Sequence, residues 1–224
     1  MNVVFIGTPE FAVPSLKCLI ESKHDVAAVL TQTDKPKGRK GKPEAPPVKN
    51  IALDAGLQVI QPENVNSEQV IEELEKLSPD VIVVVAFGQK ISDKILNLPK
   101  HKCVNIHASL LPKYRGAAPI NWAVVNGEKE TGITTIIMSN KMDAGDVIIR
   151  KSLTIGPEET AGELGNRLSR LGAETLLDSL TQIETGDAKY TQQDESLVSL
   201  APKIKKKQTV LLTGIKKKKR YTIL

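Results

Sequence analysis

Short apolar runs separated by helix-compatible segments are the feature that most constrains the fold of this chain. Residues 81–85 form a continuous run of valine and isoleucine, which is typical of a parallel strand buried on both faces. Similar runs predict further strands at residues 3–6, 26–30, 59–60, 103–107, 133–138 and 147–153. Helices are expected between them at residues 8–22, 48–55, 67–77, 119–126 and 161–185. This alternation predicts an α/β fold, in which an open, mostly parallel, twisted sheet of Rossmann-like type carries helices on both faces.

The carboxyl ends of three predicted strands carry residues suited to a ligand site. Gly7 ends the first strand, the sequence AFG at 86–88 follows another, and Asn105 and His107 lie at the end of a third. Ligands of open α/β sheets bind beyond the carboxyl ends of the strands, near the reversal in strand order. We therefore expect these loops to converge on one cleft. The chain has neither a GxGxxG pattern nor a GxxxxGK[ST] loop, which disfavours a nucleotide cofactor.

Asn105, His107 and Asp143 form a candidate catalytic set. Asn105 and His107 are two residues apart on one predicted strand, so their side chains should leave the same face. An amide can donate a hydrogen bond to an oxyanion without titrating, and an imidazole can donate a hydrogen bond or exchange a proton. The carboxylate of Asp143 can orient the imidazole and help to take a proton from an attacking amine. These groups suit the transfer of an acyl group to an amine, with neither a metal nor a covalent enzyme intermediate.

The charge of the chain is unevenly distributed. The sequence contains 31 Lys and Arg and 26 Asp and Glu. Residues 203–224 hold nine of the basic residues and no acidic one, so residues 1–202 hold 22 basic and 26 acidic residues, a net charge of −4. The body of the chain is therefore mildly acidic, and its total charge does not indicate a generally basic nucleic-acid binder.

One compact basic segment interrupts this acidic body. Residues 33–47 are rich in Lys, Gly and Pro and predict a loop. Its cations fall within eight residues and are Lys35, Lys37, Arg39, Lys40 and Lys42. A run of this kind is often only a solvated surface. Beside an acyl-transfer cleft, however, it also suits contacts with the phosphates of an RNA end.

Composition argues against several other classes of protein. The sequence has no run of about 18 apolar residues, so no membrane-spanning helix is expected. The first residues show no export-type apolar block, and the chain is expected to be cytoplasmic. Cys18 and Cys103 lack the spacing of metal ligands and predict buried, reduced thiols. No metal site is expected.

Five phrases stand out along the chain: FIGTPEFA at 5–12, TQTDKP at 31–36, VVAFG at 84–88, NIHASLLP at 105–112 and DAGD at 143–146. Their order and spacing resemble the methionyl-tRNA formyltransferase family over about residues 1–202. The resemblance implies a Rossmann-like formyltransferase domain. It also implies transfer of a formyl group from 10-formyltetrahydrofolate to the amino group of methionine on initiator methionyl-tRNA, a step of translation initiation.

The resemblance also implies roles for particular residues. It assigns catalysis to Asn105, His107 and Asp143. The folate co-substrate is expected to contact three loops, comprising Phe87, Gly88, Gln89, Lys90, Ile91, Ser109, Leu110, Leu111, Pro112, Ser139, Asn140, Lys141 and Met142. Such loops can supply the apolar slot and backbone hydrogen-bonding groups that a pterin needs. Binding of the tRNA acceptor stem falls to Lys35, Lys37, Arg39, Lys40 and Lys42, among which Arg39 matches the key arginine of the family.

The chain departs from the family after about residue 202. Family members continue into a C-terminal barrel domain that also binds tRNA, whereas residues 203–224 are rich in lysine. We expect one catalytic domain at 1–202, followed at 203–224 by a disordered basic tail in place of the barrel. A truncated or frameshifted chain is the favoured hypothesis, and a naturally short enzyme is the alternative. For a truncated chain, folate binding should be normal and the KM for tRNA raised.

Three other activities remain as alternatives. Glycinamide ribonucleotide formyltransferases fit the length of the chain, but their first strand leads into a Gly/Ser-rich phosphate-binding turn, where this chain has TPEF at 8–11. Sugar-amine formyltransferases have no evident use for the basic segment. A folate-binding remnant with little activity is the third alternative, and the complete catalytic set argues against it. The protein is expected to be a monomer.

Overall fold

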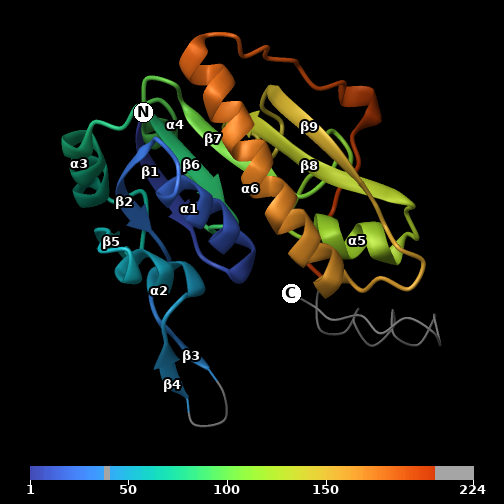
Figure 1. Ribbon diagram of the computed structural model, residues 1–224, viewed down its shortest axis with the longest axis horizontal. Helices are drawn as coiled ribbons and strands as arrows, with labels where there is room; N and C mark the ends of the chain where they lie inside the picture. The colour runs from blue at the N-terminus through green and yellow to red at the C-terminus, as the bar shows by residue number, and fades with distance from the viewer. Residues whose placement is uncertain (38–40, 205–224) are drawn as a thin grey trace.

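The computed structural model describes residues 1–37 and 41–204, and its centre is a seven-stranded sheet (Figure 1). The strands lie in the order β5-β2-β1-β6-β7-β8-β9. Their bounds are β1 (Asn2–Gly7), β2 (Asp25–Leu30), β5 (Val59–Ile60), β6 (Val81–Val85), β7 (Cys103–His107), β8 (Glu130–Ile137) and β9 (Val147–Thr154). The pairings from β5 to β7 are parallel, while β8 and β9 are antiparallel to their neighbours. The predicted α/β fold with a mostly parallel sheet is confirmed.

The described residues also form six α-helices and two short 3-10 helices, between the strands and after β9. The α-helices are α1 (Val13–Ile20), α2 (Pro47–Asp54), α3 (Glu68–Leu77), α4 (Asp93–Leu96), α5 (Pro119–Val125) and α6 (Ala161–Thr185), and the 3-10 helices are η1 (Glu10–Ala12) and η2 (Glu195–Leu197). The helix predicted at 8–22 starts too early. Pro14 has no backbone N–H and suits the first turn of a helix, so the α-helix begins beside it at Val13.

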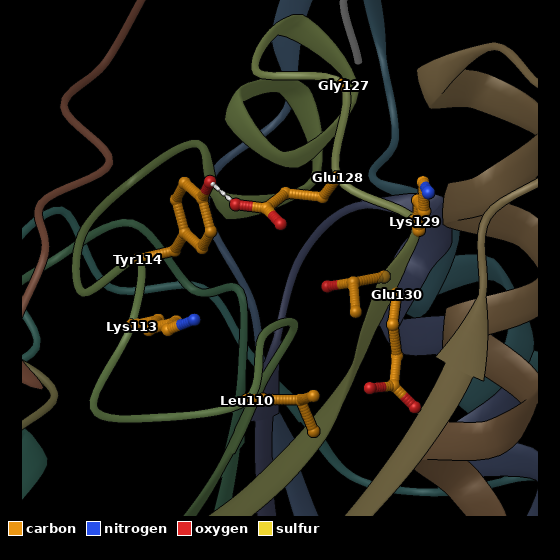
Figure 2. Close-up of a pocket in the computed structure, with 8 residues that line it drawn as sticks. Leu110, Lys113, Tyr114, Gly127, Glu128, Lys129 and Glu130 are labelled. Carbon is orange, nitrogen blue, oxygen red and sulfur yellow. Dashed lines mark hydrogen bonds between the residues drawn. The ribbon is translucent and has the colours of Figure 1, made fainter.

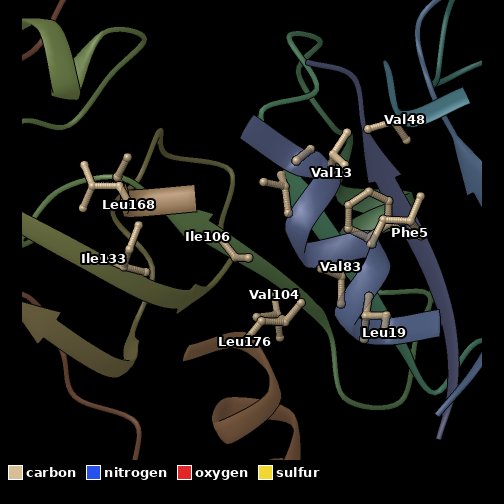
Figure 3. Packing of buried hydrophobic residues seen from close by; sticks show 14 of the residues in the cluster. Phe5, Val13, Leu19, Val48, Val83, Val104, Ile106, Ile133, Leu168 and Leu176 are labelled. Atoms are coloured by element: carbon tan, nitrogen blue, oxygen red, sulfur yellow. The ribbon is translucent and has the colours of Figure 1, made fainter. Parts of the chain in front are cut away.

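The core has one layer on each face of the sheet because side chains alternate along each strand. On one face, Val3 and Phe5 of β1 belong to a buried cluster that includes residues of α1, α2 and α6, and Figure 3 shows part of it. On the other face, Val4 and Ile6 pack with residues of α3 and α4. Each fully buried aliphatic or aromatic side chain contributes about 1.5–3 kcal/mol, so both layers stabilise the strands that carry the site.

Helix α6 is the longest element, and its sequence defines both of its ends. Thr160 accepts a hydrogen bond from the Glu163 N–H while the Glu163 carboxylate accepts one from the Thr160 N–H, which forms a capping box. Gly186 closes the helix in the left-handed conformation, with φ +80°. Figure 1 shows α6 crossing the face of the sheet near β7 and β8, which it covers with a stripe of buried leucines.

The basic segment predicted as a loop contains a two-stranded hairpin. Strands β3 (Lys35–Lys37) and β4 (Lys42–Glu44) pair antiparallel, with Pro36 opposite Pro43. Proline is depleted in strands, so composition gave no signal for this pairing. The base of the hairpin is anchored at Asp34, whose carboxylate accepts hydrogen bonds from Lys49 and Gln61. Figure 1 shows the hairpin pointing away from the sheet on the side of α2.

Both cysteines are free thiols. Cys103 is fully buried, and burial raises its pKa to about 12, whereas Cys18 is only partly buried. The prediction of buried thiols therefore holds for Cys103 but only partly for Cys18, which lies on the short helix α1. Within the described part of the chain, no helix is both long and apolar enough to cross a membrane.

Candidate active site

The alternation of side chains along β7 places the candidate catalytic residues. Val104 and Ile106 pack into the core layer beneath α6. Asn105 and His107 therefore face the opposite side of the sheet. His107 is buried, with 6% of its side chain exposed, and Asn105 is half-buried. The pair lies at the carboxyl end of β7, next to the antiparallel strand β8.

The imidazole of His107 lies between a carboxylate and a carbonyl oxygen. Its Nδ1 is 3.6 Å from Oδ1 of Asp143, which is an ion-pair distance rather than a hydrogen bond. Its Nε2 is 2.9 Å from the backbone oxygen of Tyr114. A carbonyl oxygen only accepts hydrogen bonds, so this contact assigns a hydrogen to Nε2. Nδ1 is thus left facing the carboxylate and can receive a proton there.

Asp143 is held in an unusual backbone conformation. Its φ is +51°, in the left-handed region, which few residues other than glycine adopt. Its second carboxylate oxygen, Oδ2, accepts a hydrogen bond from the Gly116 N–H at 2.8 Å. The loop that carries Asp143 closes tightly on β8, because the Ile137 N–H donates to the Asp146 oxygen at 2.9 Å. This arrangement directs the carboxylate toward His107.

Asn105 differs from the other two candidates in having an unengaged side chain. Among the described residues, none forms a hydrogen bond with its amide group. The amide is also not among the fully buried polar groups that lack a partner. It is therefore available to a ligand that lies against this face of β7.

The first segment predicted to bind folate follows β6, and most of its side chains serve the fold. Phe87 and Ile91 are buried in the core layer beside α3 and α4. The side chain of Gln89 accepts a hydrogen bond from the Val65 N–H and donates to the Glu63 oxygen. Gly88 has φ +85°, so the chain turns sharply here. This segment can therefore offer a ligand mainly its backbone groups.

The second predicted segment, at 109–112, is anchored by a residue that sequence reasoning missed. The Thr134 hydroxyl on β8 donates to the Ser109 oxygen at 2.7 Å and accepts from the Leu111 N–H at 3.1 Å. The side chain of Leu111 is buried, so it packs into the core. In the third predicted segment, Met142 is 73% exposed and lies directly before Asp143.

Two hollows on the surface have linings that do not include the catalytic candidates. One, of about 330 Å³, is lined by Leu110, Lys113, Tyr114, Gly127, Glu128, Lys129, Glu130 and Thr131 (Figure 2). In it, the Tyr114 hydroxyl donates to Glu128 at 2.5 Å, and burial raises the pKa of Tyr114. The other, of about 570 Å³, lies between the end of β5 and α3. Neither is lined by Asn105, His107 or Asp143, so the catalytic candidates do not lie in either hollow.

Comparison with known proteins identifies the chain. The model of the Formyl transferase family matches residues 1–180. The methionyl-tRNA formyltransferase of Geobacter metallireducens is 49% identical over 211 residues, which cover 94% of this chain and 68% of the relative. That of Moorella thermoacetica is 51% identical over 211 residues, with the same two coverages. The chain belongs to the methionyl-tRNA formyltransferase family.

Membership of the methionyl-tRNA formyltransferase family confirms the predicted resemblance and the predicted enzyme class. The chain spans about two thirds of the length of these relatives. Solved structures at lower identity show the same fold. Glycinamide ribonucleotide transformylase 1 from Symbiobacterium toebii has a TM-score of 0.70 at 16% identity, covering 87% of this chain and 94% of its own. HypX from Aquifex aeolicus, solved with tetrahydrofolic acid, has a TM-score of 0.69 at 22% identity, covering 92% of this chain and 30% of its own.

The residues predicted to bind tRNA in this formyltransferase are only partly described. Lys35 is exposed at the base of the hairpin, and the backbones of Lys37 and Lys42 pair across it. Arg39 and Lys40 lie outside the described residues, as does nearly all of the predicted tail. Lys35 forms a short hydrogen bond with Gln32, and the Gln32 amide donates to the Phe87 oxygen at 2.6 Å. The hairpin base is thus connected to the loop after β6.

Sequence reasoning also missed the residues that hold the catalytic candidates. Tyr114 and Gly116 contact His107 and Asp143 through backbone atoms, which no residue type announces. The phrase YRG at 114–116 is visible in the sequence, but the aromatic side chain of Tyr114 by itself indicates only packing. Gln193 donates a hydrogen bond to the backbone oxygen of Asp143, and it lies beyond the residues matched by the Formyl transferase model. In the described residues, no group of three or more His, Cys, Asp or Glu could hold a metal ion.

Proposed function

We propose that this chain transfers the formyl group of 10-formyltetrahydrofolate to the amino group of methionine on initiator methionyl-tRNA. One observation carries the proposal. Asn105 and His107 share one face of β7, and Asp143 is held against the imidazole in a member of the methionyl-tRNA formyltransferase family. The three groups are those that acyl transfer to an amine requires.

The first step is attack of the neutral amine on the formyl carbon. A new C–N bond forms, and the electron pair of the C=O bond moves to oxygen, which becomes an oxyanion. The Asn105 amide is free to donate a hydrogen bond to this oxygen, whereas the Nε2–H of His107 already donates to Tyr114. A preorganised donor of this kind contributes about 3–4 kcal/mol to the stability of the transition state. Asn105 is therefore the principal oxyanion donor.

The second step moves one proton. The attacking nitrogen becomes positively charged and must lose a proton before the intermediate collapses. His107 receives this proton on Nδ1, and the nearby Asp143 carboxylate stabilises the imidazolium that results. The C–N10 bond then breaks, the oxyanion re-forms a carbonyl, and the proton passes to N10 of the departing tetrahydrofolate. Atoms and charge balance without a metal or a cysteine nucleophile.

Folate binding by this chain follows from the same site. The loops after β6 and β7 leave the carboxyl ends of two neighbouring parallel strands. The loop before Asp143 leaves the antiparallel strand β8 at its other end, and its Asp143 reaches His107. Gly88, Gln89, Lys90 and the 109–112 segment remain the proposed contacts. The HypX structure was solved with tetrahydrofolic acid, which supports a folate ligand for this fold.

A direct assay tests the proposed acceptor. The purified chain is incubated with 10-formyltetrahydrofolate and, in parallel, with charged initiator methionyl-tRNA, glycinamide ribonucleotide or a nucleotide-linked amino sugar. Formyl-methionine should form on the tRNA, with little product from the two small amines. Uncharged tRNA is the matched control, because it binds without offering an amine. Preferential formylation of either small amine would show that the assigned acceptor is wrong.

Neutralising the hairpin cations should weaken tRNA binding more than chemistry. Replacement of Lys35, Lys37, Arg39, Lys40 and Lys42 by glutamine removes charges that suit RNA phosphates. The KM for tRNA should rise, and the dependence of log KM on log salt should flatten by about 0.7–0.9 for each phosphate that the variant no longer neutralises. The KM for the formyl donor should change little. Steady-state kinetics over a range of salt concentrations measures each quantity.

A control for the loss of positive charge in general uses two exposed lysines elsewhere. Lys94 on α4 and Lys100 after it are exposed and lie outside the hairpin. Their double replacement by glutamine should leave both KM values and the salt dependence near those of the parent chain. If the control and hairpin variants behave alike, the hairpin has no specific part in tRNA binding.

A further inference from the structure

Three consecutive residues hold both titratable members of the catalytic set. The backbone oxygen of Tyr114 accepts a hydrogen bond from Nε2 of His107 at 2.9 Å. Two residues later, the Gly116 N–H donates to the Asp143 carboxylate at 2.8 Å. The distance between the imidazole and the carboxylate therefore depends on where the 114–116 segment lies. What fixes this segment fixes the geometry of the site.

Arg115, between these two contacts, is buried and extensively bonded. Only 7% of it is exposed. Its guanidinium donates through Nε and Nη2 to Oε1 of Gln193, at 3.0 and 2.8 Å, and also binds the carboxylate of Glu195. The hydrogen bond from Arg115 lowers the pKa of Glu195. The backbone of Arg115 is also paired, donating to the Ser199 oxygen and accepting from the Ala201 N–H.

Gln193 connects Arg115 to the loop of the catalytic carboxylate. It is 5% exposed, and its Nε2 donates to the backbone oxygens of Asp143 and Gly145, each at 2.8 Å. Its Oε1 accepts both hydrogen bonds from Arg115. The guanidinium can only donate and the two carbonyls can only accept, so the amide has one possible orientation. All four of its hydrogen-bonding positions are used.

We propose that Gln193, together with Arg115, is a positioning residue that sets the Asp143 carboxylate against His107. The inference rests on the proposed formyl transfer. Asp143 has a left-handed backbone that its surroundings must maintain, and Gln193 binds the carbonyl oxygen of that residue. Arg115 holds the other side of the carboxylate through its neighbour Gly116. Gln193 thereby joins the two loops between which the imidazole and the carboxylate meet.

Gln193→Leu removes all four hydrogen bonds at nearly constant size. The kcat for formyl transfer should fall on the order of 10-fold to 100-fold, because misplacement of a catalytic group by about 1 Å has effects of that size. The KM values for folate and tRNA should change little, since Gln193 is not among the proposed ligand contacts. Gln192→Leu is the matched control, because Gln192 directly precedes Gln193 and its side chain is exposed.

Gln193→Glu separates the two halves of the contact. The new carboxylate keeps an acceptor for Arg115 but presents no donor to the oxygens of Asp143 and Gly145. It should fold with its buried charge paired, and kcat should still fall about as far as for Gln193→Leu. All rates are measured at a temperature where circular dichroism shows each variant fully folded. A loss of kcat that disappears after correction for the folded fraction would mean that Gln193 is only structural.

A spectroscopic measurement keeps the inference independent of turnover. The chain has three histidines, so the imidazole NMR signals of His107 can be assigned with a His107→Asn variant. Gln193→Leu and Gln193→Glu should shift the His107 signals and leave those of His24 and His101 unchanged. This outcome is readable even if the parent chain proves not to formylate tRNA. The proposal would be overturned if both Gln193 variants showed unchanged His107 signals and a kcat equal to that of the Gln192→Leu control.

Discussion

Replacing Asn105 by alanine should lower kcat by about 10²- to 10³-fold, the usual cost of removing one preorganised oxyanion donor. Replacing Asp143 by alanine should lower kcat by about 10²- to 10⁴-fold, since it removes the group that orients His107 and stabilises its protonated form. Both effects should lie mainly in kcat, because the interactions strengthen as charge develops in the transition state. Single-turnover formylation of methionyl-tRNA measures the chemical step directly.

Folding should survive both substitutions. The Asn105 amide makes no hydrogen bond within the described residues, and there the Asp143 carboxylate accepts one from Gly116. Asn166→Ala on α6 and Asp187→Ala after it are matched controls at exposed positions outside the site. Their rates should equal that of the parent chain. Near-parental rates in both site variants would contradict the mechanism.

Gly145→Ala should cost at least about 3 kcal/mol of folding stability, at the upper end for overpacking, and most of the activity. A Cβ atom at this position would lie 1.7 Å from the backbone oxygen of Ile137, so the backbone itself must move. The strain is purely a matter of space, because Gly145 does not have a positive φ. The displaced loop carries Asp143 and accepts two hydrogen bonds from Gln193, so stability and catalysis should fall together.

Gly156→Ala is the matched control for this prediction. Its Cβ would lie 3.4 Å from Glu159, in ordinary contact, and the position lacks a positive φ. Urea unfolding should show little change in this variant and a large loss in Gly145→Ala. Equal unfolding free energies in the two variants would show that the loop at 143–146 yields more easily than its packing indicates.

The elements that the sequence predicted well are those with a strong local signal. The run at 103–107 and the capped, leucine-striped helix at 161–185 agree with the structure residue for residue. The helix predicted at 8–22 is too long because Pro14 places the first turn later, and the hairpin at 35–44 was missed because its prolines and lysines give no strand signal. Apolar patterns predict that an element exists, whereas residues such as Pro14 decide where it begins.

The sequence predicts the candidate catalytic residues but not the groups that hold them in place. The residues expected to perform chemistry were chosen by type, and the structure brings His107 and Asp143 within 3.6 Å of each other. The groups that hold them are the backbone oxygen of Tyr114, 7 residues from His107, the N–H of Gly116, 27 residues from Asp143, and the side chain of Gln193, 50 residues from Asp143. No periodicity or motif reports such contacts, because they exist only after the chain has folded.

These holding contacts also impose an order on how the enzyme becomes competent. The hydrogen bond between Gln193 and Asp143 spans 50 residues, and that between Arg115 and Gln193 spans 78. The last strand of the sheet ends at Thr154. Contacts between segments distant in sequence form slowly. A chain emerging from the ribosome can therefore complete its sheet well before Gln193 arrives. On the proposal above, the Asp143 carboxylate is positioned only when the segment that carries Gln193 has packed against the 143–145 loop.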